Sequence, residues 1–296
     1  MAFQIVTDSA SDMPLEIKDK YDIHVIPTPV TIEGTDFFDS ENIFPDEFYR
    51  IQKEGKDIKT YHISQYMFVQ HFTPYAERGD EVLYICFSTG VAGTYNAAIL
   101  ARDEIKERYP DFEMTIIDSK SASCGIALIV DRLFVMKENG APKEVLLKAA
   151  KFYGDSHVEH MITVTSLEYL IKGGRVSKFS GAMGGALDIK PIIIINKSGA
   201  LEPKEKVRGF RKAVSRLIEM VGERGVDLDK QRVFICIGTD KALGEEIAER
   251  LKETYDIKSV IAGQVGCAIG AHTGPGVVGI VFLNASEEEF AEYLKY

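Results

Sequence analysis

The sequence predicts a two-domain α/β protein, with a Rossmann-like N-terminal domain built on a parallel sheet and a C-terminal domain built on a mixed sheet. Three observations support this prediction. At 296 residues the chain exceeds the size at which a single core keeps growing. Its first half alternates short apolar runs with helical patterns, as βαβ units do. Its second half changes to a series of strands, two of which are joined by a hairpin-like turn.

The N-terminal domain, which we place at residues 1–157, alternates strands with helices. Three runs have the length and β-branched content of buried strands: Phe3–Val6, Val82–Phe87 and Met114–Ile117. Polar residues and then a helical pattern follow each run, at Pro14–Tyr21, Gly93–Tyr109 and Ser123–Glu138. An insertion at about 24–78 interrupts this order with an extended, turn-containing segment and two helices: His24–Phe38, Pro45–Glu54 and Gln65–Glu77.

The C-terminal domain, residues 158–296, follows a helix at Pro142–Tyr153, and we place the boundary near Asp155–Glu159. Six strands are predicted: Met161–Thr165, Ile189–Asn196, Leu201–Val207, Val233–Gly238, Ser259–Gln264 and Val277–Leu283. The turn Asn196–Gly199 predicts a hairpin, because Asn and Gly tolerate a positive φ. Three helices complete the domain: Phe210–Glu223, Leu243–Tyr255 and Glu287–Leu294.

The charge pattern argues against a general nucleic-acid binder and indicates a specific anionic partner. The formal net charge is −10, whereas neutralising nucleic-acid phosphates needs an excess of basic residues. Between Ser166 and Arg216, however, eleven Lys and Arg stand against four Asp and Glu, so this segment carries +7 and the rest of the chain −17.

The sequence also predicts where the protein resides. No stretch approaches the roughly 18 apolar residues of a membrane helix, and the N-terminus lacks the basic region and cleavage site of a signal peptide. We therefore expect a cytoplasmic protein without stable membrane insertion. The cysteines have no Cys-x-x-Cys spacing and are expected to be buried thiols: Cys86, Cys124, Cys236 and Cys267.

Small polar residues follow three strands of the predicted parallel sheet, where helix N-termini and loop amides converge on ligands. These loops are Thr7–Asp12, Ser88–Tyr95 and Asp118–Ser123. Their hydroxyls donate hydrogen bonds without filling a pocket, so they predict a site for one small carboxylate-bearing ligand. Helix capping is the competing role, and we favour it for Asp12 and Ser123. For the middle loop we favour binding, because Gly90 and Gly93 let the backbone approach a ligand closely.

His272 lies in a glycine-rich segment, Gly270–Gly276, between two predicted strands. A histidine in such a segment is not a core packer. We favour ligand contact, or support of a neighbouring hydroxyl, over a turn hydrogen bond. His157 and His160 are three residues apart with acids nearby, but no further His or Cys cluster completes a metal site, and we predict none.

No catalytic or nucleotide motif is complete. The sequence has no Gly-x-Ser-x-Gly, and Ser88 has no neighbour that would activate it. The run Gly181–Gly185 does not follow a strand in a dinucleotide-binding frame. The basic stretch Lys172–Arg175 follows a helical segment and is interpreted as a helix end, with an exposed cationic turn as the alternative. We assign no catalytic residue and no cofactor.

A series of short motifs occurs in order over essentially the whole chain. They are Thr7–Asp12, Ser64-Gln65, Ser88–Gly90 with Gly93–Tyr95, Asp118-Ser119, Tyr169–Ser177, Ile189–Ile192, Arg208-Gly209 with Lys212-Ala213, and His272–Gly276. Each is short, and their joint occurrence in this order is specific. Together they resemble the DegV family, whose members include the fatty-acid-binding (FakB-type) subunit of bacterial fatty acid kinase.

The resemblance implies a non-enzymatic protein that holds a long-chain fatty acid between its two domains. Such a protein presents the acid to a separate ATP-dependent fatty acid kinase, which forms an acyl phosphate for phospholipid synthesis. The implied carboxylate-binding residues are Ser64, Ser88, Thr89, Thr94 and His272, supported by Asp8, Ser9, Gly90, Gly93, Thr273 and Gly274. The implied kinase-docking residues are Arg175, Arg208 and Arg211, which lie in the +7 segment.

Two departures from the family pattern affect the expected ligand. Ile63 and Ala92 stand where the family usually has hydroxyl residues. A fatty acid remains the first expectation, since about fourteen methylenes at ~0.8 kcal/mol each supply ~11 kcal/mol of transfer free energy. A different acyl ligand is the alternative. Two other functions stay open: an enzyme, either a hydrolase using Ser88 with His272 or a phosphotransferase acting on a small carboxylate, and a regulatory acyl-ligand sensor.

Overall fold

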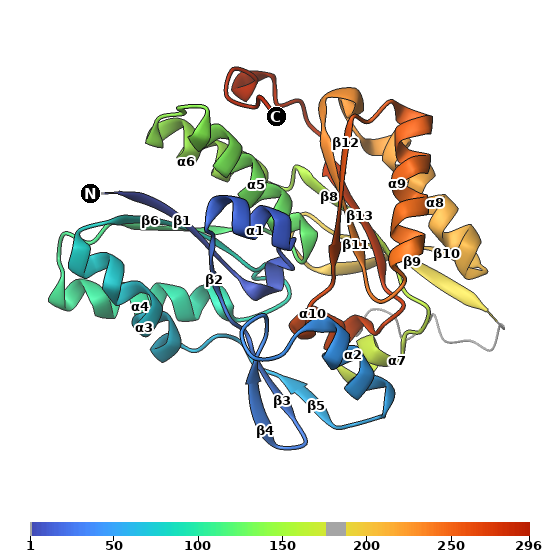
Figure 1. Ribbon diagram of the computed structural model, residues 1–296, viewed down its shortest axis with the longest axis horizontal. Helices are drawn as coiled ribbons and strands as arrows, with labels where there is room; N and C mark the ends of the chain where they lie inside the picture. The colour runs from blue at the N-terminus through green and yellow to red at the C-terminus, as the bar shows by residue number, and fades with distance from the viewer. Residues whose placement is uncertain (1, 176–187) are drawn as a thin grey trace.

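The computed structural model describes residues 2–175 and 188–296. The glycine run Gly181–Gly185 and the motif residues Val176 and Ser177 lie outside the described residues. Within the described chain, two large sheets stand side by side, and a small third sheet lies below them in the view of Figure 1.

A four-stranded parallel sheet forms the N-terminal half, in the order β2-β1-β6-β7, as the sequence predicted. Its strands are β1 (Phe3–Asp8), β2 (His24–Ile26), β6 (Glu81–Cys86) and β7 (Met114–Asp118). Helices cover both faces, which is why the centres of the strands are mostly apolar and buried (Figure 1). One face carries α3 (Gln65–Arg78) and α4 (Thr94–Arg108); the other carries α1 (Leu15–Tyr21), α5 (Cys124–Glu138) and α6 (Lys143–Gly154).

The middle of the predicted insertion, residues 29–60, folds into a small antiparallel sheet with one helix, whereas its ends belong to the parallel-sheet half as β2 and α3. The sheet has the order β4-β3-β5 and consists of β3 (Pro29–Ile32), β4 (Thr35–Phe38) and β5 (Ile58–Thr60), with α2 (Pro45–Lys53) beside it. The predicted extended segment with a turn is confirmed, since Glu33 and Gly34 take positive φ between β3 and β4. Strand β5 was not predicted, because it is three residues long and shows no apolar alternation.

The C-terminal half contains a mixed six-stranded sheet in the order β10-β9-β8-β13-β11-β12. Its strands are β8 (Val158–Thr163), β9 (Ile189–Ile195), β10 (Leu201–Arg208), β11 (Arg232–Ile237), β12 (Ser259–Gln264) and β13 (Val278–Leu283). The predicted hairpin is confirmed between β9 and β10. Two helices, α8 (Phe210–Arg224) and α9 (Lys241–Tyr255), cover the outer face (Figure 1).

Helix α5 packs against both large sheets, and this position explains its composition. Thirteen of its fifteen residues, Cys124–Met136, are buried. They join residues of β1 and β6 on one side and of β11 and β13 on the other in a single apolar cluster. A helix that is apolar all round is one that is enclosed on all sides.

The predicted helix Glu287–Leu294 is wrong. Only a 3₁₀ turn at Glu288–Phe290 forms there. The Glu287 carboxylate is held by Arg132 Nε at 2.7 Å and by Tyr153 Oη at 2.6 Å. The side-chain amide of Asn139 donates to two carbonyls near the chain end. These tertiary bonds hold the segment in its non-helical path.

Candidate functional site

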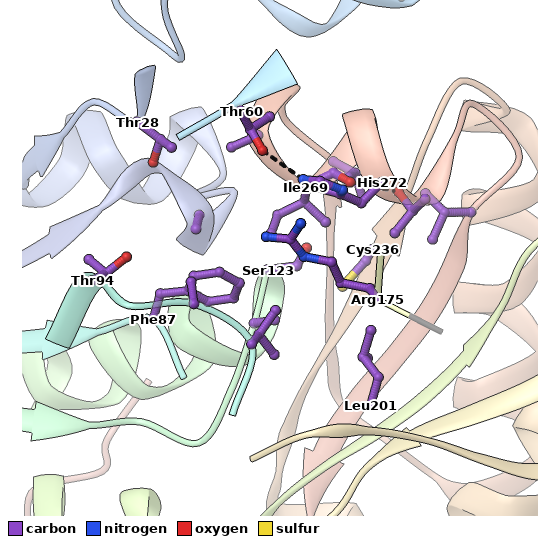
Figure 2. A pocket seen from close by; sticks show the side chains of 18 of the residues that line it. Thr28, Thr60, Phe87, Thr94, Ser123, Arg175, Leu201, Cys236, Ile269 and His272 are labelled. Atoms are coloured by element: carbon purple, nitrogen blue, oxygen red, sulfur yellow. Dashed lines mark hydrogen bonds between the residues drawn. The ribbon is translucent and has the colours of Figure 1, made fainter. Parts of the chain in front are cut away.

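A cavity of about 360 Å³ lies between the two large sheets. Its walls are mostly apolar and come from both halves of the chain (Figure 2). Side chains that line it include Phe87, Val91, Ile162, Leu201, Cys236 and Val281. The cavity is therefore built to enclose an apolar group, with polar contacts restricted to particular positions on the wall.

The polar end of the cavity is formed by Thr60 and His272. Thr60 Oγ1 lies 2.7 Å from His272 Nε2 (Figure 2). His272 Nδ1 is buried and has no hydrogen-bond partner within the described chain. Burial, and then the nearby charge of Arg175, lower the pKa of His272 to about 4, so the imidazole is neutral at pH 7. A neutral imidazole offers one donor and one acceptor.

Arg175 brings a positive charge to this polar end. Helix α7 (Glu168–Lys172) ends at Gly173, and Gly174 takes a positive φ of 68°. Arg175 then lies in the cavity wall, with Nη1 donating to the Gly173 carbonyl at 2.5 Å (Figure 2). Burial lowers its pKa without neutralising it. Within residues 2–175 and 188–296, it is the only Lys or Arg that lines the cavity.

Arg175 is also exposed to solvent, so the kinase-docking role implied for it stays a prediction beside its place in the cavity wall. The predicted helix end at Lys172–Arg175 is confirmed. The other two implied docking residues lie on the surface: Arg208 is exposed at the end of β10, and Arg211 is exposed at the start of α8, 2.5 Å from Glu246. Part of the +7 segment is neutralised, because Arg216 pairs with Glu205 and Glu223.

His272 reaches the cavity on a short helix, α10 (Cys267–Thr273), and not on a loop as predicted. The carboxylate of Asp39 accepts hydrogen bonds from the backbone N–H groups of Cys267 and Ala268, each at 3.1 Å. Asp12 Oδ1 accepts from the Gly266 N–H at 2.8 Å. These acceptors come from 228 to 254 residues away in sequence, so the local pattern of glycines did not reveal the helix.

The capping roles predicted for Asp12 and Ser123 are wrong. The Asp12 carboxylate is buried and accepts from Gly266 and from the Ser123 hydroxyl, which joins the two predicted caps to each other. Ser123 has a φ of +53° and occupies the N-cap position of α5, but its side chain makes no capping hydrogen bond there. Asp8 is the residue that caps, because its Oδ1 accepts from the Ala10 N–H at 3.1 Å. Burial raises the pKa of Asp8 to about 6.

Only two of the five predicted carboxylate-binding side chains, Thr94 and His272, line the cavity. The other three bond elsewhere. Ser88 Oγ donates to the Gly199 carbonyl at 2.7 Å, Thr89 Oγ1 donates to Asp118 Oδ2 at 2.6 Å, and Ser64 Oγ accepts from the Met67 N–H as the cap of α3. Of the supporting residues, Asp8, Gly93 and Thr273 line the cavity, and Ser9, Gly90 and Gly274 do not.

Thr60 and Thr28 line the cavity and were missed. Thr60 precedes by three residues the position at which Ile63 replaces a hydroxyl residue of the family pattern. Ile63 itself is buried in the core between α3 and the parallel sheet. The hydroxyl of Thr60, three residues before this altered position, was therefore the feature of the sequence that could have identified it as a site residue.

The geometry gives no support to a hydrolase that uses Ser88 with His272. Ser88 bonds to the β9–β10 turn and lies outside the cavity wall, whereas His272 bonds to Thr60. Among the described residues, no group of three or more His, Cys, Asp or Glu is placed to hold a metal ion. In the same part of the chain, no helix is both long and apolar enough to cross a membrane.

Comparison with known proteins identifies relatives over nearly the full chain. The DegV family model, described as an uncharacterised protein of that family, matches residues 2–285. A DegV domain-containing protein of Clostridium perfringens is 32% identical over 288 residues, which are 97% of this chain and 99% of that protein. A fatty acid-binding protein of Thermotoga maritima is 35% identical over 286 residues, 94% and 96% of the two chains.

Solved structures with the same fold include a stearic-acid-binding protein of Eubacterium ventriosum. It has a TM-score of 0.86 and 29% identity, with 95% of this chain and 98% of that chain covered. A DegV lipid-binding protein of Thermotoga maritima has a TM-score of 0.83 and 32% identity, with 96% and 99% covered. The α/β fold with a parallel and a mixed sheet is shared with these proteins. The chain belongs to the DegV family.

Proposed function

We propose that this protein binds one long-chain fatty acid in the cavity between its sheets and presents the carboxylate to a separate ATP-dependent fatty acid kinase. One observation carries the binding proposal. Among the described residues, Arg175 is the one Lys or Arg that lines the mostly apolar cavity, and it lies next to the Thr60–His272 pair. An apolar chain with one anionic end matches that arrangement, and relatives over 30% identical bear the description fatty acid-binding.

The proposed carboxylate site consists of Arg175, Thr60 and His272, with Thr94 as a further donor. Arg175 supplies a charge-assisted hydrogen bond worth about 1.5–3 kcal/mol. The acyl chain supplies most of the affinity, and the polar end fixes which way the acid lies.

Access from outside supports the presentation step. Thr60, Arg175 and His272 also line an outer groove of about 700 Å³. Four lysines line that groove, Lys53, Lys56, Lys59 and Lys172, of which the last two pair with the groove residues Asp57 and Glu168. A carboxylate held by the three shared residues is thus reachable from the surface, and the lysines favour the approach of a phosphate-bearing partner.

The binding proposal is tested by denaturing the purified protein and extracting its ligand for mass spectrometry. We expect long-chain fatty acid in near-stoichiometric amount. We also expect Arg175→Gln to raise the Kd for octadecanoic acid about ten-fold or more, because a charged donor is lost. Arg50→Gln, at an exposed site on α2, is the matched control. Absence of fatty acid from the extract, together with no binding of added acid, excludes the proposal.

The kinase proposal has a separate test. Charge reversal at Arg208 and Arg211 is expected to slow acyl phosphate formation by the partner kinase and ATP at least ten-fold, while octadecanoic acid affinity stays unchanged. Arg50→Glu again serves as the control. Equal rates for the wild type and the reversed variant would remove these arginines from the docking surface, and no acyl phosphate with any fatty acid kinase would exclude the presenting role.

A further inference from the structure

One wall of the cavity contains a buried imidazole that the proposed function does not use. His160 and Ile162 alternate along β8 with Met161, so the first two face the cavity and Met161 faces the core under α8 and α9. The neighbouring strands contribute Cys236 and Val281 to the same wall. His160 is thus a polar side chain within an apolar surface.

His160 is enclosed and lacks hydrogen bonds. It is 2% exposed, and neither ring nitrogen makes a hydrogen bond within the described chain. Burial lowers its pKa to about 4, so the ring is neutral and has one donor and one acceptor nitrogen. The carbonyls of Val158 and Ala122 lie close enough to favour a proton on the ring, but not in hydrogen-bonding geometry. Since carbonyls only accept, neither can serve the acceptor nitrogen.

The fold makes room for this particular ring. Nε2 of His160 lies against Gly125 in the first turn of α5, where an added Cβ would be only 2.0 Å from that nitrogen. A residue with a side chain at position 125 would displace the ring. The imidazole is therefore accommodated by a glycine in the opposite half of the protein.

Strand register places His160 away from the polar end of the cavity. Thr163 pairs with Val278, next to the segment that leaves α10, whereas His160 pairs with Val281. Three residues of strand correspond to roughly 10 Å. An acyl chain that starts at Arg175 and His272 and follows this wall passes Ile162 and Cys236 before it reaches His160.

We propose that the preferred ligand is a fatty acid with a hydroxyl group along its chain, and that this hydroxyl donates a hydrogen bond to the acceptor nitrogen of His160. The inference rests on the proposed function, because it takes the carboxylate as bound at the other end. A hydroxyl can donate to the acceptor nitrogen, whereas an oxo group at the same carbon has no proton to give and can only accept from the donor nitrogen.

The first test compares ligands on the wild-type protein. Kd values are measured for octadecanoic acid, for hydroxyoctadecanoic acids with the hydroxyl at successive carbons, and for the matching oxo acids. We expect one hydroxyl position, or two adjacent ones, to bind roughly five- to ten-fold more tightly than octadecanoic acid. The oxo acid at that position can only accept from the ring N–H and should bind less tightly than the hydroxy acid.

The second test removes the imidazole. His160→Leu should abolish the preference for the hydroxy acid while retaining or strengthening the binding of octadecanoic acid. His157→Leu is the matched control, because His157 lies at the start of the same strand, stacks on Phe152 and does not line the cavity. This control should keep the preference.

Two outcomes overturn the inference. In one, no hydroxyl position binds more tightly than octadecanoic acid to the wild type, which would mean that a water molecule satisfies the ring. In the other, the preference persists in His160→Leu. If octadecanoic acid still binds in either case, the preference for a hydroxy acid is rejected and the proposed binding of fatty acids stands. If no fatty acid binds at all, the proposed function itself is rejected. The ligand series on the wild type decides the question even if the leucine variant does not fold.

Discussion

Of the histidines that line the cavity, His160 and His272 have a pKa lowered by burial, and both are neutral at pH 7. His272 has Thr60 as a partner for one nitrogen, whereas His160 has no hydrogen-bond partner within the described chain. The pKa of each falls from the ordinary value of 6.5 to about 4, mainly through loss of hydration of the charged form. Both rings are thus suited to neutral hydrogen bonding, and neither supplies the positive charge that Arg175 does.

The lowered pKa of His160 predicts how stability depends on pH. Between pH 6.5 and 4 the unfolded chain binds a proton at this residue and the folded chain does not, so the free energy of unfolding falls as the pH falls. His160→Leu should lose this dependence. We expect urea denaturation to show that the wild type loses about 3 kcal/mol more than the variant between pH 7 and pH 4.

Comparing the two proteins cancels the contributions of other groups. The raised pKa of Asp8, about 6, acts in the opposite direction, since its folded form holds a proton that the unfolded chain has released. This contribution of Asp8 is the same in the wild type and in His160→Leu, so it cancels in the comparison. Parallel pH profiles for wild type and His160→Leu would show that the ring does not remain neutral in the folded protein.

Single site residues were predictable only where their role was local. His272 stood out because glycines and a proline surround it. Ser88 lies outside the cavity wall, where its hydroxyl donates to the Gly199 carbonyl, 111 residues away in sequence. Asp12 was misassigned because its partner Gly266 is 254 residues distant. Hydroxyl residues in strand-end loops look alike in sequence whether they face a ligand or a neighbouring loop.

Among the elements, α10 depends most on the rest of the protein. It has seven residues and includes a glycine, which is too little for a stable isolated helix. Its first N–H groups are satisfied by Asp39 and Asp12 from the opposite half of the chain. The orientation of His272 therefore depends on two carboxylates that do not themselves line the cavity.

Removing one of these carboxylates tests that dependence. Asp39→Ala leaves two buried N–H groups of α10 without acceptors and should lower the free energy of unfolding by about 1–2 kcal/mol. The variant should also bind fatty acid more weakly under conditions in which it is fully folded, because His272 would no longer be held at hydrogen-bonding distance from Thr60. Calorimetry of both properties provides the measurement.

The control lies on the same hairpin. Asp36→Ala removes an exposed carboxylate that bonds only to Thr31 at 2.7 Å, and both properties should stay close to those of the wild type. Equal losses for the two variants would indicate that the hairpin as a whole matters and that the bonds to α10 do not.

Elements were predictable where apolar periodicity was long. The predicted Phe210–Glu223 and Leu243–Tyr255 match α8 and α9 to within two residues at each end. The helix predicted at Glu287–Leu294 failed because its first carboxylate is bound by Arg132 and Tyr153. Short elements that complete the site were set by contacts distant in sequence, which periodicity does not report.

One close loop contact beside the cavity joins the two halves of the molecule, in addition to α5 and to the bonds of Asp12 and Asp39 at the start of α10. Gly90, after β6, packs against the β9–β10 turn, where an added Cβ would be 2.4 Å from the Gly199 carbonyl carbon. Ser88 Oγ bonds to the same turn. The two large sheets are thus held at a fixed spacing beside the cavity.

Gly90→Ala should force these backbones apart. We expect a loss of about 1–3 kcal/mol in the free energy of unfolding, together with faster release of bound fatty acid as the cavity opens. Stopped-flow displacement of a fluorescent fatty acid measures the release. Gly93→Ala is the control in the same loop, since nothing lies within 4 Å of its added Cβ. Unchanged release from Gly90→Ala would show that this contact does not hold the cavity closed.

At this scale the sequence predicted the two sheets, their parallel and mixed character and the hairpin. A boundary between residues 157 and 158 stays a prediction. The cavity was an implication of the family resemblance, because the distance between two sheets depends on packing that no local pattern reports.

The enclosure of α5 has a consequence for any attempt to divide the protein. A cut after residue 157 would leave α5 in the first fragment with much of its apolar surface exposed to water, since β11 and β13 would be gone. The fragment would aggregate, and the second fragment would lose the cover of its inner face. Although it has two large sheets, the chain is expected to unfold in a single cooperative step. Neither half is expected to fold when it is expressed alone.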